Sequence, residues 1–259
     1  MALRCVYTDL DGTLLGAGAS LFHTGGGEFT LLAARALEAC HRAGVEVVLV
    51  SGRRRTQVAE DARLIGQSCY AFEIGSGIVI DGEQRLLVGP FEPREGLLPH
   101  ALIERSGAPA LLLEAFAGEL EVHSPWHLGR EVSHVFRGQV EVGRANELLG
   151  AEGHGELELI DNGDIEDGRR CYHLIPAAAS KAAAVALHMH ARGLAPDECI
   201  AVGDSREDLE IAPLVGRFFV VANAGADVGS GAGANVQRTE AGHGEGFYEA
   251  VVRSLAEAP

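Results

Sequence analysis

The sequence predicts an α/β protein with a largely parallel central sheet and an inserted α+β segment. Short apolar runs alternate with helical patterns towards both ends of the 259-residue chain, as expected when parallel strands are joined by crossover helices. Between these parts, residues 83–178 change to alternating or mixed runs, a pattern typical of an antiparallel sheet. We therefore predict a Rossmann-like core made of residues 1–82 and 179–259, with residues 83–178 inserted as an α+β domain.

Each element of the predicted core is an apolar run or a helical pattern bounded by glycine or polar residues. In the first part these are a strand at 5–8, a helix at 31–43, a strand at 45–50, a helix at 56–65 and short strands at 71–74 and 78–80. In the last part they are a helix at 181–192, a strand at 199–202, a short helix at 208–214, a strand at 218–221 and a helix at 247–256. Both parts are expected to build one sheet.

The inserted segment is less regular than the core. Its runs at 110–116 and 119–123 alternate or mix apolar and polar residues, and a helical pattern covers 143–149. Outside the insert, the glycine-rich stretch at 16–27 follows the first strand closely. It is either a flap over the ends of the strands or an exposed loop.

The charge balance excludes two classes of partner. Asp and Glu number 37 against 21 Lys and Arg, with a formal net charge of −16, so nucleic acid and anionic membranes would be repelled. No apolar run approaches the roughly 20 residues of a membrane span, and the first residues lack the layout of a secretory signal. We therefore predict a cytoplasmic protein that binds neither nucleic acid nor membranes, with its oligomeric state left open.

The cysteines and one pair of histidines lack the spacing of metal sites. The five cysteines are odd in number, lie far apart and include no C-x-x-C pair, which predicts neither a disulfide framework nor a zinc site. His188 and His190 are two apart on one predicted helix, the wrong spacing to share a metal, and are expected on the helix surface.

Polar side chains follow three of the predicted strands. Asp9 and Asp11 follow the first strand, Ser51 follows the second, and Asp204 follows the strand at 199–202. Because the carboxyl ends of parallel strands share one edge and side chains two apart point to the same side, we expect Asp9 and Asp11 together, with Asp204 nearby. Clustered carboxylates repel unless a cation or a shared proton lies between them. An all-oxygen cluster of this kind predicts bound Mg²⁺.

Each of these residues also has a purely structural interpretation. Asp9 and Asp11 would serve as turn-forming acids, and Ser51 as a loop hydroxyl. Lys181, the only lysine in the chain, would be a solvated residue at a helix start, where a cation is slightly unfavourable and an anion is the natural ligand. The occurrence of all these residues at predicted strand ends and one helix start favours a functional site.

Four motifs in this order resemble those of the haloacid dehalogenase (HAD) superfamily of phosphohydrolases. They are Asp9-Leu-Asp-Gly-Thr13, Ser51-Gly-Arg53, the lone Lys181 and Gly203-Asp-Ser-Arg-Glu-Asp208. The resemblance covers the core at both ends of the chain and implies a HAD core. The long insert between the second and third motifs is similar to the large cap of the Cof-like branch, a layout shared by sucrose phosphatase and mannosyl-3-phosphoglycerate phosphatase.

The resemblance implies a role for each of these residues. Asp9 would attack phosphorus and form an aspartyl phosphate, while Asp11 would protonate the leaving alcohol and later take a proton from water. Mg²⁺ would be held by Asp9, the backbone carbonyl of Asp11 and Asp204, with Asp208 as outer support or a further ligand. The phosphoryl oxygens would be bound by Ser51, the Gly52 amide, Lys181 and backbone amides at Leu10 to Gly12.

One position departs from the family's pattern. Glu207 stands where relatives often carry an asparagine that contacts phosphate. A carboxylate would repel phosphate, so we expect Glu207 to face the water shell of the metal or the solvent.

Four further residues are candidates for binding the rest of the substrate. Arg53 and Arg54 would reach a second anionic group, although Arg53 would equally pair with an acid of the scaffold. Trp126 and His127 combine an aromatic face with a hydrogen-bonding group, which suits a sugar. The alternative is that Trp126 is packed within the insert and His127 is a surface group.

The sequence therefore predicts a Mg²⁺-dependent phosphatase acting on a small phosphorylated metabolite, a sugar phosphate or a glycosyl-3-phosphoglycerate. Two other functions use the same kinds of residue. One is phosphoryl transfer to another sugar, as in the phosphomannomutases, and the other is a non-enzymatic receiver-type signalling domain built on a phosphoaspartate. A receiver domain is much shorter and has no insert, so the chain length disfavours it.

Overall fold

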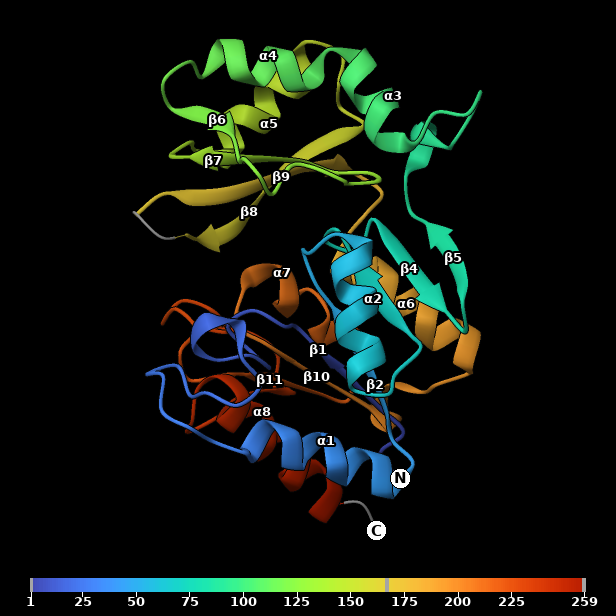
Figure 1. Ribbon diagram of the computed structural model, residues 1–259, viewed down its shortest axis with the longest axis vertical. Coiled ribbons are helices and arrows are strands. Elements are labelled where there is room, and N and C mark those ends of the chain that lie inside the picture. The colour runs from blue at the N-terminus through green and yellow to red at the C-terminus, as the bar shows by residue number, and fades with distance from the viewer. Residues whose placement is uncertain (1, 166–167, 258–259) are drawn as a thin grey trace.

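The chain forms two sheets of different kinds in a computed structural model, which describes residues 2–165 and 168–257. The larger sheet has the strand order β12-β11-β10-β1-β2-β3-β4-β5, and the smaller has the order β6-β7-β9-β8. Figure 1 shows the two sheets as separate layers, with the smaller one above the larger. The predicted α/β fold with a parallel core is confirmed.

The elements have the following bounds. The strands of the larger sheet are β1 Cys5–Thr8, β2 Glu46–Val50, β3 Tyr70–Phe72, β4 Gly77–Ile80, β5 Glu83–Leu86, β10 Cys199–Gly203, β11 Arg217–Val220 and β12 Val236–Arg238. The strands of the smaller sheet are β6 Leu120–Val122, β7 His134–Gly138, β8 Leu157–Asp164 and β9 Arg170–Pro176. The helices are α1 Leu32–Ala43, α2 Arg55–Leu64, α3 Pro99–Ser106, α4 Ala108–Ala115, α5 Val142–Ala151, α6 Lys181–Arg192, α7 Arg206–Leu209 and α8 His243–Ala256, with short 3-10 helices at Ala17–Ala19, Gly89–Phe91, Pro196–Glu198 and Ala212–Leu214. No helix within the described residues has the length and apolar content needed to cross a membrane.

Strand β1 is the centre of the larger sheet. It pairs in parallel with β2 on one side and with β10 on the other, so both ends of the chain contribute to one sheet as predicted. Its residues are buried on both faces: Val6 packs with apolar side chains of α1 and α8, and Tyr7 packs with those of α6. This double burial explains why β1 is a continuous apolar run rather than an alternating one.

Three segments differ from their predicted structure. Residues 83–86 form β5 and pair with β4, so the start of the predicted insert belongs to the larger sheet. Most of the run at 110–116 is helical and lies in α4. The helix expected at 208–214 is divided into α7 and a 3-10 turn that contains Pro213, because proline lacks the amide hydrogen needed to continue an α-helix.

The smaller sheet is antiparallel throughout, as predicted. Helices α3, α4 and α5 cover the face that Figure 1 shows away from the larger sheet. Tyr172 and Leu174 of β9 belong to the apolar core beneath these helices. Because side chains alternate along a strand, His173 and Ile175 face the other way, and Ile175 packs against Ile74 of the larger sheet's β3–β4 turn.

Candidate active site

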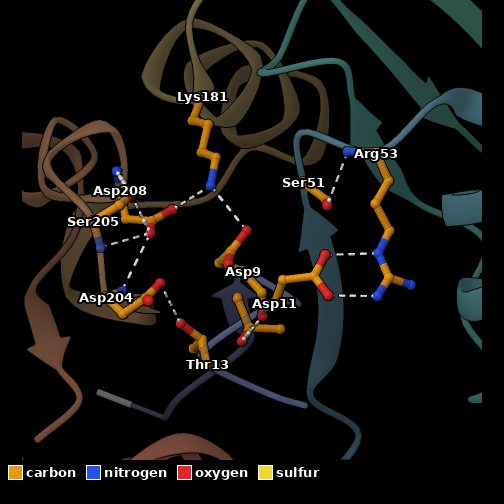
Figure 2. Close-up of polar contacts among 10 residues, drawn as sticks. Asp9, Asp11, Thr13, Ser51, Arg53, Lys181, Asp204, Ser205 and Asp208 are labelled. Carbon is orange, nitrogen blue, oxygen red and sulfur yellow. Dashed lines mark hydrogen bonds and ion pairs between the residues drawn. The ribbon is translucent and has the colours of Figure 1, made fainter. Parts of the chain in front are cut away.

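Three carboxylates and one ammonium meet at the carboxyl ends of β1 and β10. Asp9 directly follows β1, Asp204 follows β10, and Asp208 lies in α7; carboxylate oxygens of the three lie within 4.8 Å of one another. The Lys181 Nζ donates hydrogen bonds to Asp9 Oδ1 at 2.9 Å and to Asp208 Oδ1 at 2.7 Å. Figure 2 shows the lysine reaching between the two acids. The parallel pairing of β1 with β10 thus assembles a site from residues nearly 200 positions apart.

The start of α6 positions the lysine. Ser180 caps the helix by accepting a hydrogen bond from the Ala183 amide, which makes Lys181 the first helical residue. Gly75 adopts a φ of +77°, and a Cβ there would lie 2.1 Å from the Ser180 carbonyl oxygen. A side chain at position 75 would therefore push the start of α6, and with it Lys181, away from Asp9.

Asp208 is fully engaged by hydrogen bonds. Its Oδ1 accepts from Lys181, and its Oδ2 accepts from the Asp204 amide at 3.2 Å and from the amide and hydroxyl of Ser205 at 3.2 and 2.7 Å. In contrast, Asp9 Oδ2 and Asp204 Oδ2 accept no hydrogen bond from any described residue. This geometry favours Asp9 and Asp204 as cation ligands and Asp208 as the group that holds Lys181 and the Asp204 loop in place.

The cluster is short of positive charge. Burial raises the pKa of Asp9 well above its usual value, although the positive charge of Lys181 acts in the opposite direction. Burial is also the main cause that raises the pKa of Asp204 to about 6, and the negative charge of Asp208 adds to it. Burial alone would lower the pKa of Lys181, but Asp208 and Asp9 outweigh it and raise that pKa. Three carboxylates face one ammonium, so a divalent cation with oxygen ligands would balance the charge. The side chains present therefore fit Mg²⁺.

The Asp11 carboxylate does not join this cluster. Arg53 donates from Nε to Asp11 Oδ2 at 2.7 Å and from Nη2 to Oδ1 at 2.5 Å, and it also pairs with Asp61 at 2.9 Å. Figure 2 shows the Asp11 side chain directed at Arg53. The expectation that the Asp9 and Asp11 carboxylates lie together is not met, because the chain turns after β1, with Gly12 at a φ of +85°, and the alternation of an extended strand stops.

Backbone amides that could bind an anion lie beside Asp9. The amides of Leu10 and Asp11 donate no hydrogen bond to any described residue, whereas the carbonyl groups of Leu10 and Gly12 are both used. Ser51 is buried, and its hydroxyl oxygen accepts from the Arg53 amide at 3.2 Å. Amide and hydroxyl groups of this kind can bind phosphoryl oxygens, and the phosphoryl-binding roles stay predictions.

The other predicted residues lie around this centre or away from it. The Gly52 carbonyl accepts a hydrogen bond from Arg130 at 3.0 Å, and Arg54 donates to the Leu128 carbonyl at 2.9 Å. Glu207 is half-buried, and burial raises its pKa. Trp126 is 51% exposed and is therefore not packed inside the insert, while His127 is half-buried beside it.

Three residues near the site were not predicted from the sequence. Arg130 joins the smaller layer to the loop after β2 through its hydrogen bond to Gly52. Glu73 is buried after β3 and accepts hydrogen bonds from three successive backbone amides, at positions 131 to 133. His173 is buried on the face of β9 that points at the larger sheet, and its pKa is lowered by burial and by the nearby Arg130 and Lys181. The sequence signal for His173 is a histidine inside the run Cys171–Ile175, whose other members are apolar or aromatic.

Comparison with known proteins relates the chain to one family of hydrolases. The family model for haloacid dehalogenase-like hydrolases matches residues 160–244, which include Lys181, Asp204 and Asp208. Two relatives are named phosphoglycolate phosphatase. The Halorubrum lacusprofundi protein is 27% identical over 83% of both chains, and the Methanoculleus marisnigri protein is 27% identical over 96% of this chain and 95% of its own.

Solved structures share the fold over nearly the whole chain. A Thermoplasma acidophilum protein superposes with a TM-score of 0.69 at 17% identity, covering 98% of this chain and 99% of its own. The Synechocystis sucrose-phosphatase, in complex with sucrose and phosphate, superposes with a TM-score of 0.67 at 18% identity over 98% of both chains. The fold therefore extends to the small sheet as well as the large one.

Proposed function

We propose that the chain, which matches the family model of haloacid dehalogenase-like hydrolases over residues 160–244, is a Mg²⁺-dependent phosphomonoester hydrolase that works through an aspartyl phosphate. The observation that carries this proposal is the buried contact of Lys181 with Asp9, beside an Asp204 oxygen that no described residue binds. This arrangement provides a nucleophile, a fixed positive charge and a place for a divalent cation within one cluster.

The proposed reaction has two displacements. The Asp9 carboxylate attacks phosphorus, and the bond to the ester oxygen breaks as that oxygen takes a proton from Asp11. Water then attacks the aspartyl phosphate and gives a proton to Asp11, which releases phosphate and restores Asp9. To reach the leaving oxygen, the Asp11 carboxylate must turn from its ion pair with Arg53.

Positive charge and amide donors would stabilise the transferring group. Mg²⁺, held by Asp9, the Asp11 carbonyl and Asp204, would supply positive charge against the phosphoryl oxygens. Lys181, the Ser51 hydroxyl and the amides of Gly52 and residues 10–12 would bind the same oxygens. Concentrated charge of this kind suits phosphate monoesters, for which accelerations reach ~10²¹.

The proposed substrate is a small phosphorylated metabolite with a second anionic group. Two relatives similar over most of the chain are named phosphoglycolate phosphatase, and a phosphoglycolate molecule carries a carboxylate beside its phosphate. Arg54 supports this class, because its Nε is buried without a hydrogen-bond partner among the described residues. Arg53 suits the role less well, since Asp11 and Asp61 already engage it. The predicted insert of residues 83–178, without the part that forms β5, would act as the cap that selects the substrate.

A screen for phosphate release tests this function. Phosphoglycolate, phosphoglycerate, sucrose phosphate and simple sugar phosphates would be incubated with the protein and Mg²⁺, with chelator and Asp9→Asn as controls. We expect free phosphate from at least one anionic ester and at least a thousandfold loss in Asp9→Asn, on the order reported for removal of a nucleophile. An isomerised sugar phosphate would indicate a mutase, and a persistent phosphoaspartate a receiver. Full activity of Asp9→Asn, or no phosphate from any ester, contradicts the proposal.

A further inference from the structure

A second group of metal-binding side chains lies at the opposite end of the same strands. Cys5 is the first residue of β1, Glu46 is the first residue of β2, and His188 projects from α6. The Cys5 sulfur, a Glu46 oxygen and a His188 ring nitrogen lie within 4.8 Å of one another. Because Asp9 follows the other end of β1, the two groups are separated by roughly 13 Å along the strand.

His188 has a ring nitrogen with no hydrogen bond. The residue is fully buried, which corrects the expectation that it lies on the helix surface, while its neighbour His190 is exposed. Its Nδ1 is 2.8 Å from the Tyr7 hydroxyl, but its Nε2 has no hydrogen-bond partner among the described residues and lies 3.4 Å from Glu46 Oε2. With the proton on Nδ1 and directed at Tyr7, Nε2 presents a lone pair to the cluster, as a metal-bound histidine does.

The spacing and the donor types suit zinc. Nitrogen and oxygen ligands at 2.0–2.1 Å from a tetrahedral Zn²⁺ are about 3.3 Å apart, close to the separation of His188 Nε2 and Glu46 Oε2. Sulfur, imidazole and carboxylate are the three ligand types that Zn²⁺ takes in proteins. The three side chains would occupy three positions of the tetrahedron, and a water molecule would take the fourth beside the partly exposed Glu46.

The charged groups around Cys5, Glu46 and His188 also carry an excess of negative charge, which a cation would balance. Arg192 pairs with Glu46 at 3.1 Å and with Asp81 at 2.7 Å, so two carboxylates face one guanidinium. With Cys5 as a thiolate the deficit is two positive charges, which one Zn²⁺ balances. Cys5 would release its thiol proton to solvent on binding. Glu46, whose side chain is 25% exposed, provides the path of entry.

We propose that Cys5, Glu46 and His188 bind Zn²⁺, with water in the fourth position. The ion joins β1 and β2 to α6, the helix whose first residue is Lys181. Its role is structural, because it lies at the opposite end of β1 from Asp9. Cysteine spacing alone did not predict this site, since its ligands are brought together by strand pairing rather than by a short sequence motif.

Cobalt titration of the metal-stripped, full-length protein tests the site directly. Co²⁺ bound to a thiolate gives a near-ultraviolet charge-transfer absorption, and the acid cluster contains no sulfur, so excess Mg²⁺ can occupy that cluster without interfering. We expect one equivalent of Co²⁺ to produce this absorption and one equivalent of Zn²⁺ to abolish it. Zn²⁺ at a hundredfold excess over its dissociation constant should raise Tm by roughly 5 °C or more.

Matched variants locate the ligands. Cys5→Ser and His188→Gln should lose the absorption, whereas Cys40→Ser, at a buried cysteine outside the group, and His190→Gln should keep it. Absence of the absorption in the folded wild-type protein overturns the proposal without any variant. Retention of the absorption in a folded Cys5→Ser protein overturns it as well. Phosphate release, measured separately, has no bearing on either outcome.

Discussion

Arg53 binds the Asp11 carboxylate through two parallel hydrogen bonds, at 2.7 and 2.5 Å, on the side away from Asp9. The proposed proton carrier is therefore positioned by a guanidinium rather than by the acid cluster. A planar fork matches a carboxylate in a way that an ammonium group does not.

We expect Arg53→Lys to keep the charge, lose the fork and lower kcat for phosphate release by about tenfold, while Asp11→Asn lowers it by about 10² to 10⁴. Steady-state kinetics on the best substrate measure both changes. Arg63→Lys is the control, because Arg63 pairs with the exposed Glu60. An Arg53→Lys protein with the wild-type kcat would show that the fork has no part in positioning Asp11.

Two substitutions separate the structural role of Lys181 from the chemical role proposed for it. Lys181→Met leaves Asp9 and Asp208 buried without their cation, so we expect a loss of about 3 to 5 kcal/mol in the free energy of unfolding, measured by urea denaturation without Mg²⁺. Lys181→Arg keeps the charge but places a larger planar group in a buried space, so kcat should fall by at least about a hundredfold. Near-normal turnover by Lys181→Arg contradicts the need for a compact ammonium.

Gly12 and Gly82 share nearly the same backbone conformation but differ in their surroundings. Their φ values are +85° and +84°; a Cβ at Gly12 would lie 2.3 Å from Asp204 Oδ2, whereas nothing lies within 4 Å of one at Gly82. Both Gly→Ala variants should lose about 1 kcal/mol of stability through left-handed strain. Only Gly12→Ala should also displace Asp204 and weaken Mg²⁺ binding, read as a higher Mg²⁺ requirement for phosphate release. Equal Mg²⁺ requirements would rule out this contact.

His134 makes the smaller layer sensitive to acid. Burial is the main cause that lowers the pKa of His134 to about 4, against 6.5 for the free side chain, and electrostatic repulsion by the stacked His100 adds to it. Between pH 6.5 and 4 the unfolded chain binds the proton that the folded protein does not, so the free energy of unfolding falls as the pH falls through this window. The contribution is at most about 3 kcal/mol. His134→Gln should flatten this part of the stability profile, and the exposed His190→Gln should not; identical slopes would contradict the assignment.

Glu73, which follows β3 of the larger sheet, holds the loop before β7 of the smaller sheet. Its buried carboxylate accepts hydrogen bonds from the amides of residues 131 to 133 and from the Ser133 hydroxyl. Glu73→Gln turns a donor towards one of these amides, so we expect a loss of about 2 kcal/mol in chemical denaturation. Glu95→Gln is the control, because Glu95 is exposed and has a similar left-handed φ, +54° against +49°. No difference between the two variants would contradict this role.

The parallel core and the meeting of Asp9 with Lys181 and Asp204 followed from the sequence, because these residues directly follow apolar runs or begin a helical pattern. Strand order then brings them to one edge. The direction of the Asp11 side chain did not follow, because it depends on a turn at Gly12 and on Arg53 from another strand end.

Other features were hidden because they arise only from tertiary pairing. Residues 83–86 are mostly polar, so the sequence assigned them to the insert. In the structure they form an edge strand, because they pair with β4. His188 looked like a surface residue because its helix neighbours gave no sign of Glu46 and Tyr7, which approach it from two separate strands.

The pairing of β1 with β10 also determines the order in which the protein can mature during synthesis. Cys5 in β1 can pair with Cys199 in β10 only after β10 has been synthesised. The four strands of the smaller sheet come from one continuous stretch of the chain, which leaves the ribosome before β10. Pairing across so long a segment is intrinsically slow. A nascent chain can therefore complete the small sheet while β1 still lacks one neighbour, and the proposed cation site beside Asp9 can form only after residues 199–208 have been made.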